Sequence, residues 1–450
     1  MYSKDLESVL ASLHVSIGDW IRIETDTVNI EGVLMPRTDA GESDIIVIKR
    51  KDGYNMGIRY GKGTKITKME GGRGSFSFPK APSASPNPAL KRIAMLYTGG
   101  TIGSKIDYLT GGVYMLTKPE ELLYEVPELK DIANVEIRNL MSIASEDMTY
   151  IEWQKMAEDA AKAINNGAQG VVITHGTDTM HYTSAALTFM LKGLNRPVVL
   201  TGAQRSSDRG SSDAFSNLIC SFQMAARSNV AEVGVCMHES SSDGTNIFIK
   251  GTNARKMHTS RRDAFRPING KPICKVSTDG RIEYLSSYRK VSAQDSKVSA
   301  LTGFEPKVAL VKVHPNSDPE VIDYYVGKKY KGIILEGTGL GHVPTTTSKK
   351  ELSWISHVRK AVDAGMVVGA TSQCINGRVN PNVYRNLRLL GGAGAIFCED
   401  MMPEVAYVKL GFLLGNYDSG KAREMLGVNI AGEITERTEF DSFEAVGCTT

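Results

Sequence analysis

Hydrophobic residues follow two different patterns along this chain. Up to about residue 78, one amphipathic segment is followed by brief β-rich runs such as Trp20–Ile23, Gly32–Met35 and Ile45–Ile48. Beyond residue 91, short apolar runs alternate with segments of helical spacing. The closely spaced runs predict a small closed barrel of SH3-like or Sm-like type. The alternation predicts α/β folding with doubly wound, mainly parallel sheets.

Local signals within the first region support this interpretation. Ser3 is expected to cap a helix over Lys4–Ser12, which carries Leu6, Val9 and Leu10 on one face. Asp52–Gly53 is a hairpin-turn signal that leads into a further strand at Tyr54–Ile58.

The length of 450 residues exceeds one ordinary core, so several domains are expected. Composition changes suggest where they meet, because Pro and Ser gather near residue 80 and polar residues gather near residue 295. The expected order is a barrel (1–78), a Pro/Ser-rich linker (79–90), a first α/β domain (91–290), a second linker (291–306) and a second α/β domain (307–450).

Composition is that of a globular protein of the cytoplasm, with 41% hydrophobic and 23% charged residues. The sequence contains no apolar stretch near the roughly 20 residues that span a bilayer, and its start lacks the order of a signal peptide. Six scattered cysteines without a C-x-x-C pair predict reduced thiols and no metal site. A net charge of +3 alone gives no argument for nucleic acid.

Two threonine-rich turns are the strongest chemical signal. Thr98–Ser104 follows the apolar run Ile93–Leu96, and Thr174–Met180 follows Val171–Ile173. Buried parallel strands end at one edge of a sheet, and open α/β sheets bind ligands at that edge. The two turns are therefore expected to face one crevice, where glycines let backbone N–H groups approach a reacting oxygen.

Cleaving a carboxamide needs a nucleophile, a proton acceptor and donors for the oxyanion. Thr101 lies just past two glycines, where a helix can begin, and Thr177 brings a second hydroxyl beside Asp178. Lys256 is available to take part in proton transfer if the fold brings it near Thr177. His175 has two interpretations, a general base or a brace for its loop, and we favour the brace.

These turns, together with Leu200–Arg205 and with Asp263–Phe265 after Lys256, resemble the bacterial-type L-asparaginase family over roughly residues 91 to 445. The resemblance implies a two-domain α/β amidohydrolase with no metal or organic cofactor bound by this chain. It implies that Thr101 and Thr177 are the two catalytic threonines, Asp178 the acidic partner and Lys256 the catalytic lysine.

The resemblance also assigns residues to substrate binding. Ser145 would hold the α-carboxylate of the substrate, and Glu146 with Asp178 would hold its α-ammonium. Many members of the family have glutamine where this chain has Glu146, so this site would carry extra negative charge. The family's mobile loop corresponds to residues 105–117, where Tyr108 and Tyr114 are both available as its supporting tyrosine and the sequence aligns neither uniquely; Tyr114 is favoured.

A barrel and linker before the asparaginase-like part resemble one branch of the family, the D subunits of archaeal glutamyl-tRNA(Gln) amidotransferases. The resemblance implies a glutaminase that supplies ammonia to a partner, the amidotransferase's E subunit. That partner would use ATP and Mg to convert Glu-tRNA(Gln) to Gln-tRNA(Gln), and would make most of the contact with tRNA(Gln). A homodimer core of a heterotetramer is implied. The alternatives are a free cytosolic L-asparaginase and a binding module that has lost catalysis.

Three further segments allow a structural or a functional interpretation. The basic stretch Lys49–Lys80 suits tRNA phosphates, the partner protein or solvent, and only Tyr54 and Tyr60 offer rings nearby. Gly337–His342 mimics a dinucleotide fingerprint with the wrong spacing, so we expect a strand-to-loop turn. Asp213 is expected to cap the helix that follows it.

Overall fold

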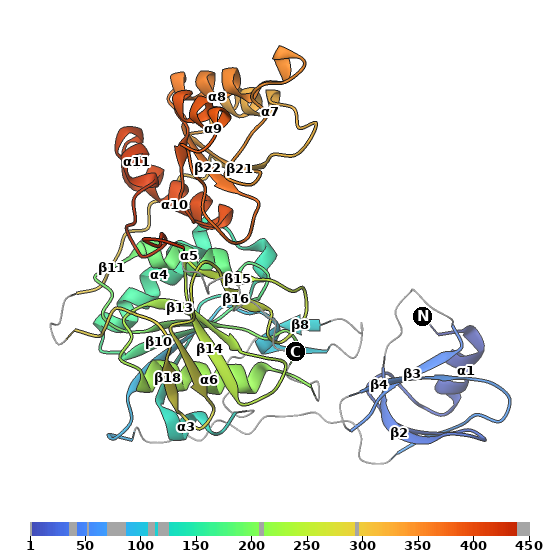
Figure 1. The fold of residues 1–450 in the computed structure, drawn as a ribbon. Helices are drawn as coiled ribbons and strands as arrows, with labels where there is room; N and C mark the ends of the chain where they lie inside the picture. Colours follow the sequence, from blue (N-terminus) through green and yellow to red (C-terminus); the bar gives the residue numbers. More distant parts are fainter. Residues whose placement is uncertain are drawn as a thin grey trace.

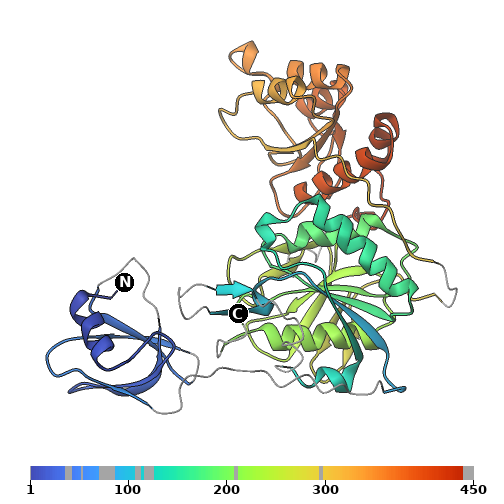
Figure 2. The ribbon, with the colours of Figure 1, turned by 180° about the vertical axis from the view of Figure 1, so that it is seen from behind.

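The computed structural model describes residues 2–35, 43–51, 54–69, 87–106, 113–115, 126–206, 211–292 and 297–438. They form an N-terminal β region, a large α/β unit and a smaller C-terminal α/β unit (Figure 1). The C-terminal unit lies on the side of the large unit that carries α4 and α5. The β region stands beside the large unit, as the view from behind also shows (Figure 2).

The N-terminal region is a five-stranded antiparallel sheet that packs against the predicted opening helix. Helix α1 (Lys4–Ser12) begins after Ser3, whose Oγ accepts a hydrogen bond from the Leu6 N–H at 3.4 Å. Along β1, Ile21 and Ile23 are buried while Trp20 and Arg22 are only partly covered, which is the alternation of a sheet with one core face. The sheet order is β4 (Asn55–Arg59), β3 (Ile45–Lys49), β2 (Asn29–Leu34), β1 (Trp20–Glu24) and β5 (Lys65–Lys68).

Strand β5 was not predicted, because Ile66 is its one apolar residue and neither face shows a pattern. The pairing of β5 with β1 places Ile66 opposite Ile23 in the core. The predicted turn at Asp52–Gly53 lies outside the described residues.

The large unit contains an eight-stranded mixed sheet. Its parallel part runs through β9 (Asn134–Asn139), β6 (Arg92–Tyr97), β10 (Gly170–Thr174), β12 (Val198–Thr201) and β13 (Val233–His238). Three antiparallel strands complete it: β14 (Thr245–Lys250), β17 (Cys274–Ser277) and β18 (Ile282–Tyr284).

Helices cover both faces of this sheet, which explains why its central strands are apolar runs without alternation. Strand β6 sends Ala94 and Leu96 to one face and Ile93 and Met95 to the other, and all four are fully buried. The first face packs against α4 (Tyr150–Asn165) and α5 (Met180–Met190). The second packs against α3 (Leu129–Ile132) and α6 (Ala214–Arg227).

The C-terminal unit repeats this plan on a smaller scale. Its parallel sheet consists of β20 (Val308–Lys312), β21 (Gly332–Gly337), β22 (Val367–Ser372) and β23 (Ile396–Phe397). One face packs against α7 (Glu320–Gly327), α8 (Trp354–Asp363) and α9 (Arg385–Gly392), and the other against α10 (Pro403–Asn416) and α11 (Ser419–Leu426).

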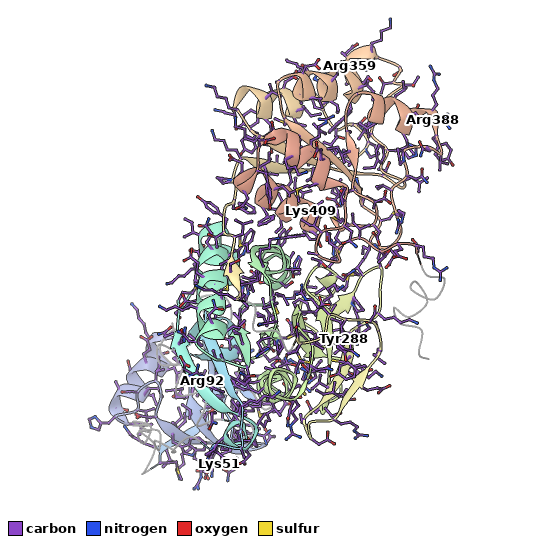
Figure 3. All side chains as sticks on the ribbon, turned by 90° about the vertical axis from the view of Figure 1, so that its left-hand side faces the viewer. Lys51, Arg92, Tyr288, Arg359, Arg388 and Lys409 are labelled. Atoms are coloured by element: carbon purple, nitrogen blue, oxygen red, sulfur yellow. The ribbon has the colours of Figure 1, made fainter. Side chains whose placement is uncertain are left out.

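Helix α10 joins the two units. It packs against α5, and the rings of Phe189 and Phe412 stack across this junction with centroids 6.0 Å apart. Lys409, labelled near the junction in Figure 3, is fully buried on α10 and pairs with the equally buried Glu433 at 2.6 Å. Part of the expected linker after residue 290 also returns to the large unit, where β19 (Ser299–Ala300) pairs with β11 (Leu191–Lys192).

Within the described ranges, no helix is both long enough and apolar enough to cross a membrane. The five cysteines in these ranges are free thiols; Cys374 is exposed, and Cys220, Cys236, Cys274 and Cys398 are buried. Cys448 lies outside the described residues.

Candidate active site

The two threonine-rich turns leave neighbouring strands at the same edge of the large sheet. Strands β6 and β10 pair in parallel, with Tyr97 opposite Thr174. The Thr98 hydroxyl donates to the Thr174 carbonyl oxygen at 2.6 Å and ties the two ends together. A Cβ on Gly100, whose φ is +84°, would lie 2.5 Å from the Gly176 nitrogen. Only glycine therefore allows the two turns to pack backbone against backbone.

Thr101 begins a single 3-10 turn (Thr101–Gly103) and is partly buried. The sequence allowed a helix to begin here, but three residues carry little of a helix dipole. This segment can therefore offer a charge at Thr101 its individual N–H groups, and not a helix dipole.

The second turn, which follows β10, lies in contact with Lys256. Lys256 ends β15 (Ala254–Lys256), which forms a hairpin with β16 (Phe265–Pro267). Its Nζ lies 2.8 Å from Thr177 Oγ1 and 2.6 Å from Asp178 Oδ1. The side chain of Lys256 is only 9% exposed, whereas that of Asp178 is 66% exposed. The fold thus joins a hydroxyl, an amine and a carboxylate from segments 78 residues or more apart.

The predicted substrate-binding residues lie beside this cluster. Ser145 and Glu146 belong to a 3-10 turn, Ser145–Asp147, and the Ser145 carbonyl oxygen accepts a 2.7 Å hydrogen bond from Thr179. A Cβ on Gly176 would lie 2.7 Å from both Cβ and Oγ of Ser145, so the turns are in close contact. Ser145 is buried and Glu146 is exposed.

The remaining predicted positions are Thr101 and the tyrosine of the loop that follows it. Among the described residues, Thr101 has no hydrogen bond to Thr177 or Lys256. Tyr114 lies on β8 (Val113–Met115), which pairs with β7 (Ser104–Ile106) directly after the Thr101 turn. Its side chain, and the whole of Tyr108, fall outside the described part of the structure.

His175 is a brace. Its Nδ1 donates to the Gly176 carbonyl oxygen at 2.6 Å, and its Nε2 therefore accepts from the Thr183 hydroxyl at 2.8 Å. Thr183 in turn accepts from Trp153 Nε1 at 3.0 Å. Complete burial lowers the pKa of His175 to about 4. Both ring nitrogens are occupied, so His175 is not available as the base.

Sequence reasoning missed Gln204, whose Oε1 accepts from the Thr177 hydroxyl at 3.4 Å. It also assigned Asp213 to the wrong task. Asp213 occupies the N-cap position of α6 but makes no capping bond. Its carboxylate instead accepts the N–H groups of Gln204 and Arg205 at 3.0 and 3.1 Å. The available signal was Gln204 itself, a long amide inside the motif Leu200–Arg205.

The C-terminal unit reaches the site through one buried carboxylate. Glu404, in the first turn of α10, contacts Arg255 NH1 at 3.1 Å and lies 4.0 Å from His181 Nε2. Burial raises the pKa of Glu404. Burial, assisted by the positive charges of Arg255 and Lys256, lowers the pKa of His181 to about 4. Arg255 precedes Lys256 on β15, so this contact connects the junction to the cluster.

An aromatic ring that the sequence analysis did not consider, that of Trp20, lies beside the described part of the basic stretch. Trp20, Arg22, Glu31, Arg50 and Lys51 line a hollow on the N-terminal sheet, and Lys51 Nζ lies 5.6 Å from the centre of the Trp20 ring. Trp20 precedes the basic stretch in sequence, and only the pairing of β1 with β2 and of β2 with β3 brings it there.

Family models match the three regions separately. The GatD N-terminal domain matches residues 15–69, the N-terminal asparaginase domain matches residues 92–289, and the glutaminase/asparaginase C-terminal domain matches residues 307–426.

Curated relatives match almost the whole chain. The D subunit of the glutamyl-tRNA(Gln) amidotransferase of Pyrococcus furiosus is 48% identical over 444 residues, which are 97% of this chain and 99% of the relative. The protein of the same name from Methanopyrus kandleri is 47% identical over 440 residues, 96% and 94% of the two chains.

Solved structures match the two α/β units. The thermostable L-asparaginase from Thermococcus kodakarensis has 28% identity and a TM-score of 0.69, over 77% of this chain and all of that one. The L-asparaginase I from Vibrio cholerae has 28% identity and a TM-score of 0.67 over the same shares.

Proposed function

Because this chain belongs to the asparaginase family, in the branch of the archaeal glutamyl-tRNA(Gln) amidotransferase D subunits, we propose that it is the glutaminase of such an enzyme. One observation carries the proposal: Lys256 contacts both Thr177 and Asp178 at the sheet edge where the Thr101 turn also begins. A hydroxyl held by a lysine beside a carboxylate is suited to moving a proton during amide cleavage.

In the proposed reaction, Thr101 Oγ1 attacks the side-chain carbonyl carbon of glutamine. Backbone N–H groups near Thr101 and Thr177 receive the oxyanion, because the glycines of both turns expose them. The C–N bond then breaks, and the leaving nitrogen takes up the proton that Thr101 has lost, which is passed on through Thr177 and Lys256, so that ammonia departs. Water cleaves the resulting ester, so that glutamate is released and Thr101 regains its proton.

Charge at the site favours a substrate with an ammonium group. Asp178 is paired with Lys256, so its negative charge is largely compensated. Glu146 on the neighbouring turn is exposed and adds the second carboxylate. In the proposal, both carboxylates bind the α-ammonium of glutamine, Ser145 binds the α-carboxylate, and Tyr114 supports the nucleophile.

The ammonia is proposed to pass to a partner, the amidotransferase's E subunit, which converts Glu-tRNA(Gln) to Gln-tRNA(Gln) with ATP and Mg. The names of the relatives and the match of residues 15–69 to the GatD N-terminal domain support a multi-subunit assembly. We propose a homodimer core within a heterotetramer, with most tRNA contacts made by the partner. This chain itself is proposed to bind no cofactor.

The test measures ammonia release from glutamine and from asparagine, with and without the partner protein and Glu-tRNA(Gln). The proposal expects glutamine turnover that rises when both are added, together with formation of Gln-tRNA(Gln). High asparagine turnover by the chain alone, unchanged by the partner, would instead favour a free L-asparaginase, the activity named for the solved structures that match 77% of this chain.

A further inference from the structure

Gln204 is a half-buried glutamine beside Thr177, and its amide carries a buried hydrogen-bond donor that has no partner among the described residues. Gln204 follows β12, and its Oε1 accepts the Thr177 hydroxyl at 3.4 Å. Within the part of the chain that the structure describes, its Nε2 is buried and has no partner. An orphaned buried amide donor costs on the order of 1–3 kcal/mol. Such a cost next to a candidate catalytic group indicates that the donor is used at another stage of the reaction.

The loop that carries Gln204 is held in place by hydrogen bonds to its backbone, and none of these bonds involves the Gln204 side chain. Asp213 accepts the backbone N–H groups of Gln204 and Arg205. Asn217 Nδ2 donates to Asp213 Oδ2 at 3.0 Å and to the Gly202 carbonyl oxygen at 2.9 Å. Since the backbone is fixed this way, the amide of Gln204 can turn about its last bond without moving the loop.

Thr177 Oγ1 accepts a hydrogen bond from Lys256 Nζ at 2.8 Å and donates its own hydrogen to Gln204 Oε1 at 3.4 Å. A lysine ammonium only donates, so while Lys256 is charged the hydrogen points to Gln204. A neutral lysine amine accepts, so the hydrogen then turns to Nζ. A half-turn of the Gln204 amide brings its Nε2 donor to the Thr177 oxygen in that second state. One amide can therefore match both protonation states.

We propose that Gln204 is a positioning residue for Thr177, an inference that rests on the proposed glutaminase function. It keeps the Thr177 hydrogen away from Lys256 in the charged state and supports the Thr177 oxygen in the neutral state. The step it serves is a proton transfer: the O–H bond of Thr177 breaks, an N–H bond forms on the neutral amine of Lys256, and the pair becomes alkoxide and ammonium.

Other charged or titratable groups face the same pair, and the test leaves them in place. Asp178 contacts Lys256 directly, Glu404 of α10 pairs with Arg255, and His181 of α5 lies near both. Asp213 stands behind the loop of Gln204. Substitution of Gln204 alone thus changes one hydrogen-bonding group among fixed charges.

The test compares Gln204→Glu with Gln204→Met in the full chain. A carboxylate only accepts and is negative, so it should hold Lys256 charged. In Gln204→Glu the rise of kcat with pH should move up by about one unit, so that kcat near neutral pH falls about tenfold. Gln204→Met should lose about tenfold at every pH without that shift. KM for glutamine should stay within twofold in both, because Gln204 is not proposed to touch the substrate.

Gln223→Glu is the matched control. Gln223 is a buried glutamine on α6 that donates to the Thr278 carbonyl oxygen at 3.1 Å, and its Oε1 is also without a partner among the described residues. It should keep the parent's pH profile. A profile of Gln204→Glu that superimposes on the parent's, or a Gln204→Met variant within twofold of the parent, overturns the proposal. Equal losses without a shift would show a purely structural role and overturn it too.

A second measurement does not depend on turnover. The titration of Lys256 can be followed by NMR in protein labelled at lysine Cε, with the signal assigned by its loss in Lys256→Met. Gln204→Glu should move this titration to higher pH by about one unit, whereas Gln204→Met and Gln223→Glu should not. An unmoved titration in Gln204→Glu overturns the proposal. If the parent chain hydrolyses no glutamine, the proposed function fails, and this measurement still decides the role of Gln204.

Discussion

The two α/β units use the same strand ends for different purposes. Gln204 follows β12 in the large unit, and Gln373 follows β22 in the C-terminal unit. Gln373 Nε2 donates to the carbonyl oxygens of Val313 and Glu336, so it fastens the ends of two neighbouring strands. The Nε2 of Gln204 has no such partner among the described residues. Gln373 thus ties together the strand ends of its sheet, whereas Gln204 leaves an amide donor free of partners among the described residues beside the Thr177 hydroxyl.

The turns differ in the same way. Strand β21 ends at Gly337, and Thr338 pairs with His342 to close a short glycine turn, as predicted for that segment. The turn after β10 instead holds the buried Thr177 hydroxyl against Lys256, and the turn after β6 packs closely beside it. In both units the parallel strands end along one edge of a sheet. The residues that follow each strand determine whether reactive side chains gather at that edge or only hold the strands together.

The largest expected effect is on glutamine turnover, and it should distinguish two lysines that lie at strand ends, Lys256 and Lys312. Lys256→Met should lower glutamine turnover by about 1,000-fold, because Thr177 and Asp178 lose the group that moves their proton. Lys312→Met removes a comparable lysine, which contacts Glu336 at 3.0 Å in the C-terminal unit, and should stay within twofold of the parent. Steady-state ammonia release checks both. Similar losses in the two variants would refute the distinction.

The next effect compares two buried aspartates. Asp213→Ala should lower turnover by about tenfold to a hundredfold, since the loop of Gln204 loses its anchor, and should cost about 3 kcal/mol of stability from buried N–H groups left unpaired. Asp400 accepts the N–H and hydroxyl of Thr435 at 3.1 and 2.5 Å. Asp400→Ala should cost similar stability with turnover nearly unchanged. Steady-state kinetics and chemical denaturation of both variants test this prediction. Intact activity in Asp213→Ala would contradict the claim that Asp213 anchors the loop of Gln204 for catalysis.

A third effect concerns acid stability of the large unit. His175 and His181 have pKa values of about 4 in the folded chain against an ordinary 6.5. The unfolded chain therefore binds more protons between these pH values, and stability present above about pH 6.5 is lost as pH falls toward 4. The loss is at most about 3 kcal/mol for each histidine. Denaturation midpoints should fall over this window and fall less in His175→Asn; an unchanged slope in that variant opposes the assignment.

The smallest expected effect is a loss of stability on substitution of Gln373, the glutamine that joins two strand ends of the C-terminal unit. Gln373→Met leaves two strand-end carbonyl oxygens without their side-chain donor and should cost about 1–2 kcal/mol of stability. Its pH profile of turnover should match the parent's, because Gln373 is not in the cluster. Thermal unfolding and the pH profile together test this. A shifted profile would mean that the C-terminal strand ends take part in the reaction.

Much of this architecture could be predicted from local sequence. The apolar run over Ile93–Leu96 and the helical spacing over Ile151–Ile164 are strong because burial on both faces of a sheet, or on one face of a helix, leaves a regular pattern. Strand β5 has one buried residue, and β19 has two residues in all, so neither leaves a readable period. Both exist because a neighbouring strand supplies the hydrogen bonds.

In the candidate site, too, some residues could be predicted from local sequence and others could not. Thr177 and Asp178 are adjacent in sequence and follow a strong strand, so the sequence alone could single them out as candidates. Gln204 and Asp213 make hydrogen bonds outside regular secondary structure, to Thr177 and to the loop before α6, and no periodicity reports such bonds. Asp213 has the sequence signature of a helix cap, but its carboxylate accepts two backbone N–H groups of the loop that precedes the helix and makes no capping bond. Which of these donors the carboxylate binds is decided by the conformation of that loop in the folded chain.

The central claim is that Thr101 attacks glutamine at an edge served by Thr177, Asp178 and Lys256. The most direct measurement labels the chain with a diazoketone analogue of glutamine and locates the adduct by mass spectrometry after trypsin. The account predicts label in the peptide of residues 93–105, lost in Thr101→Ala and slowed in Lys256→Met. Label confined to residues 163–192, or to residues 361–378 with the exposed Cys374, would contradict it.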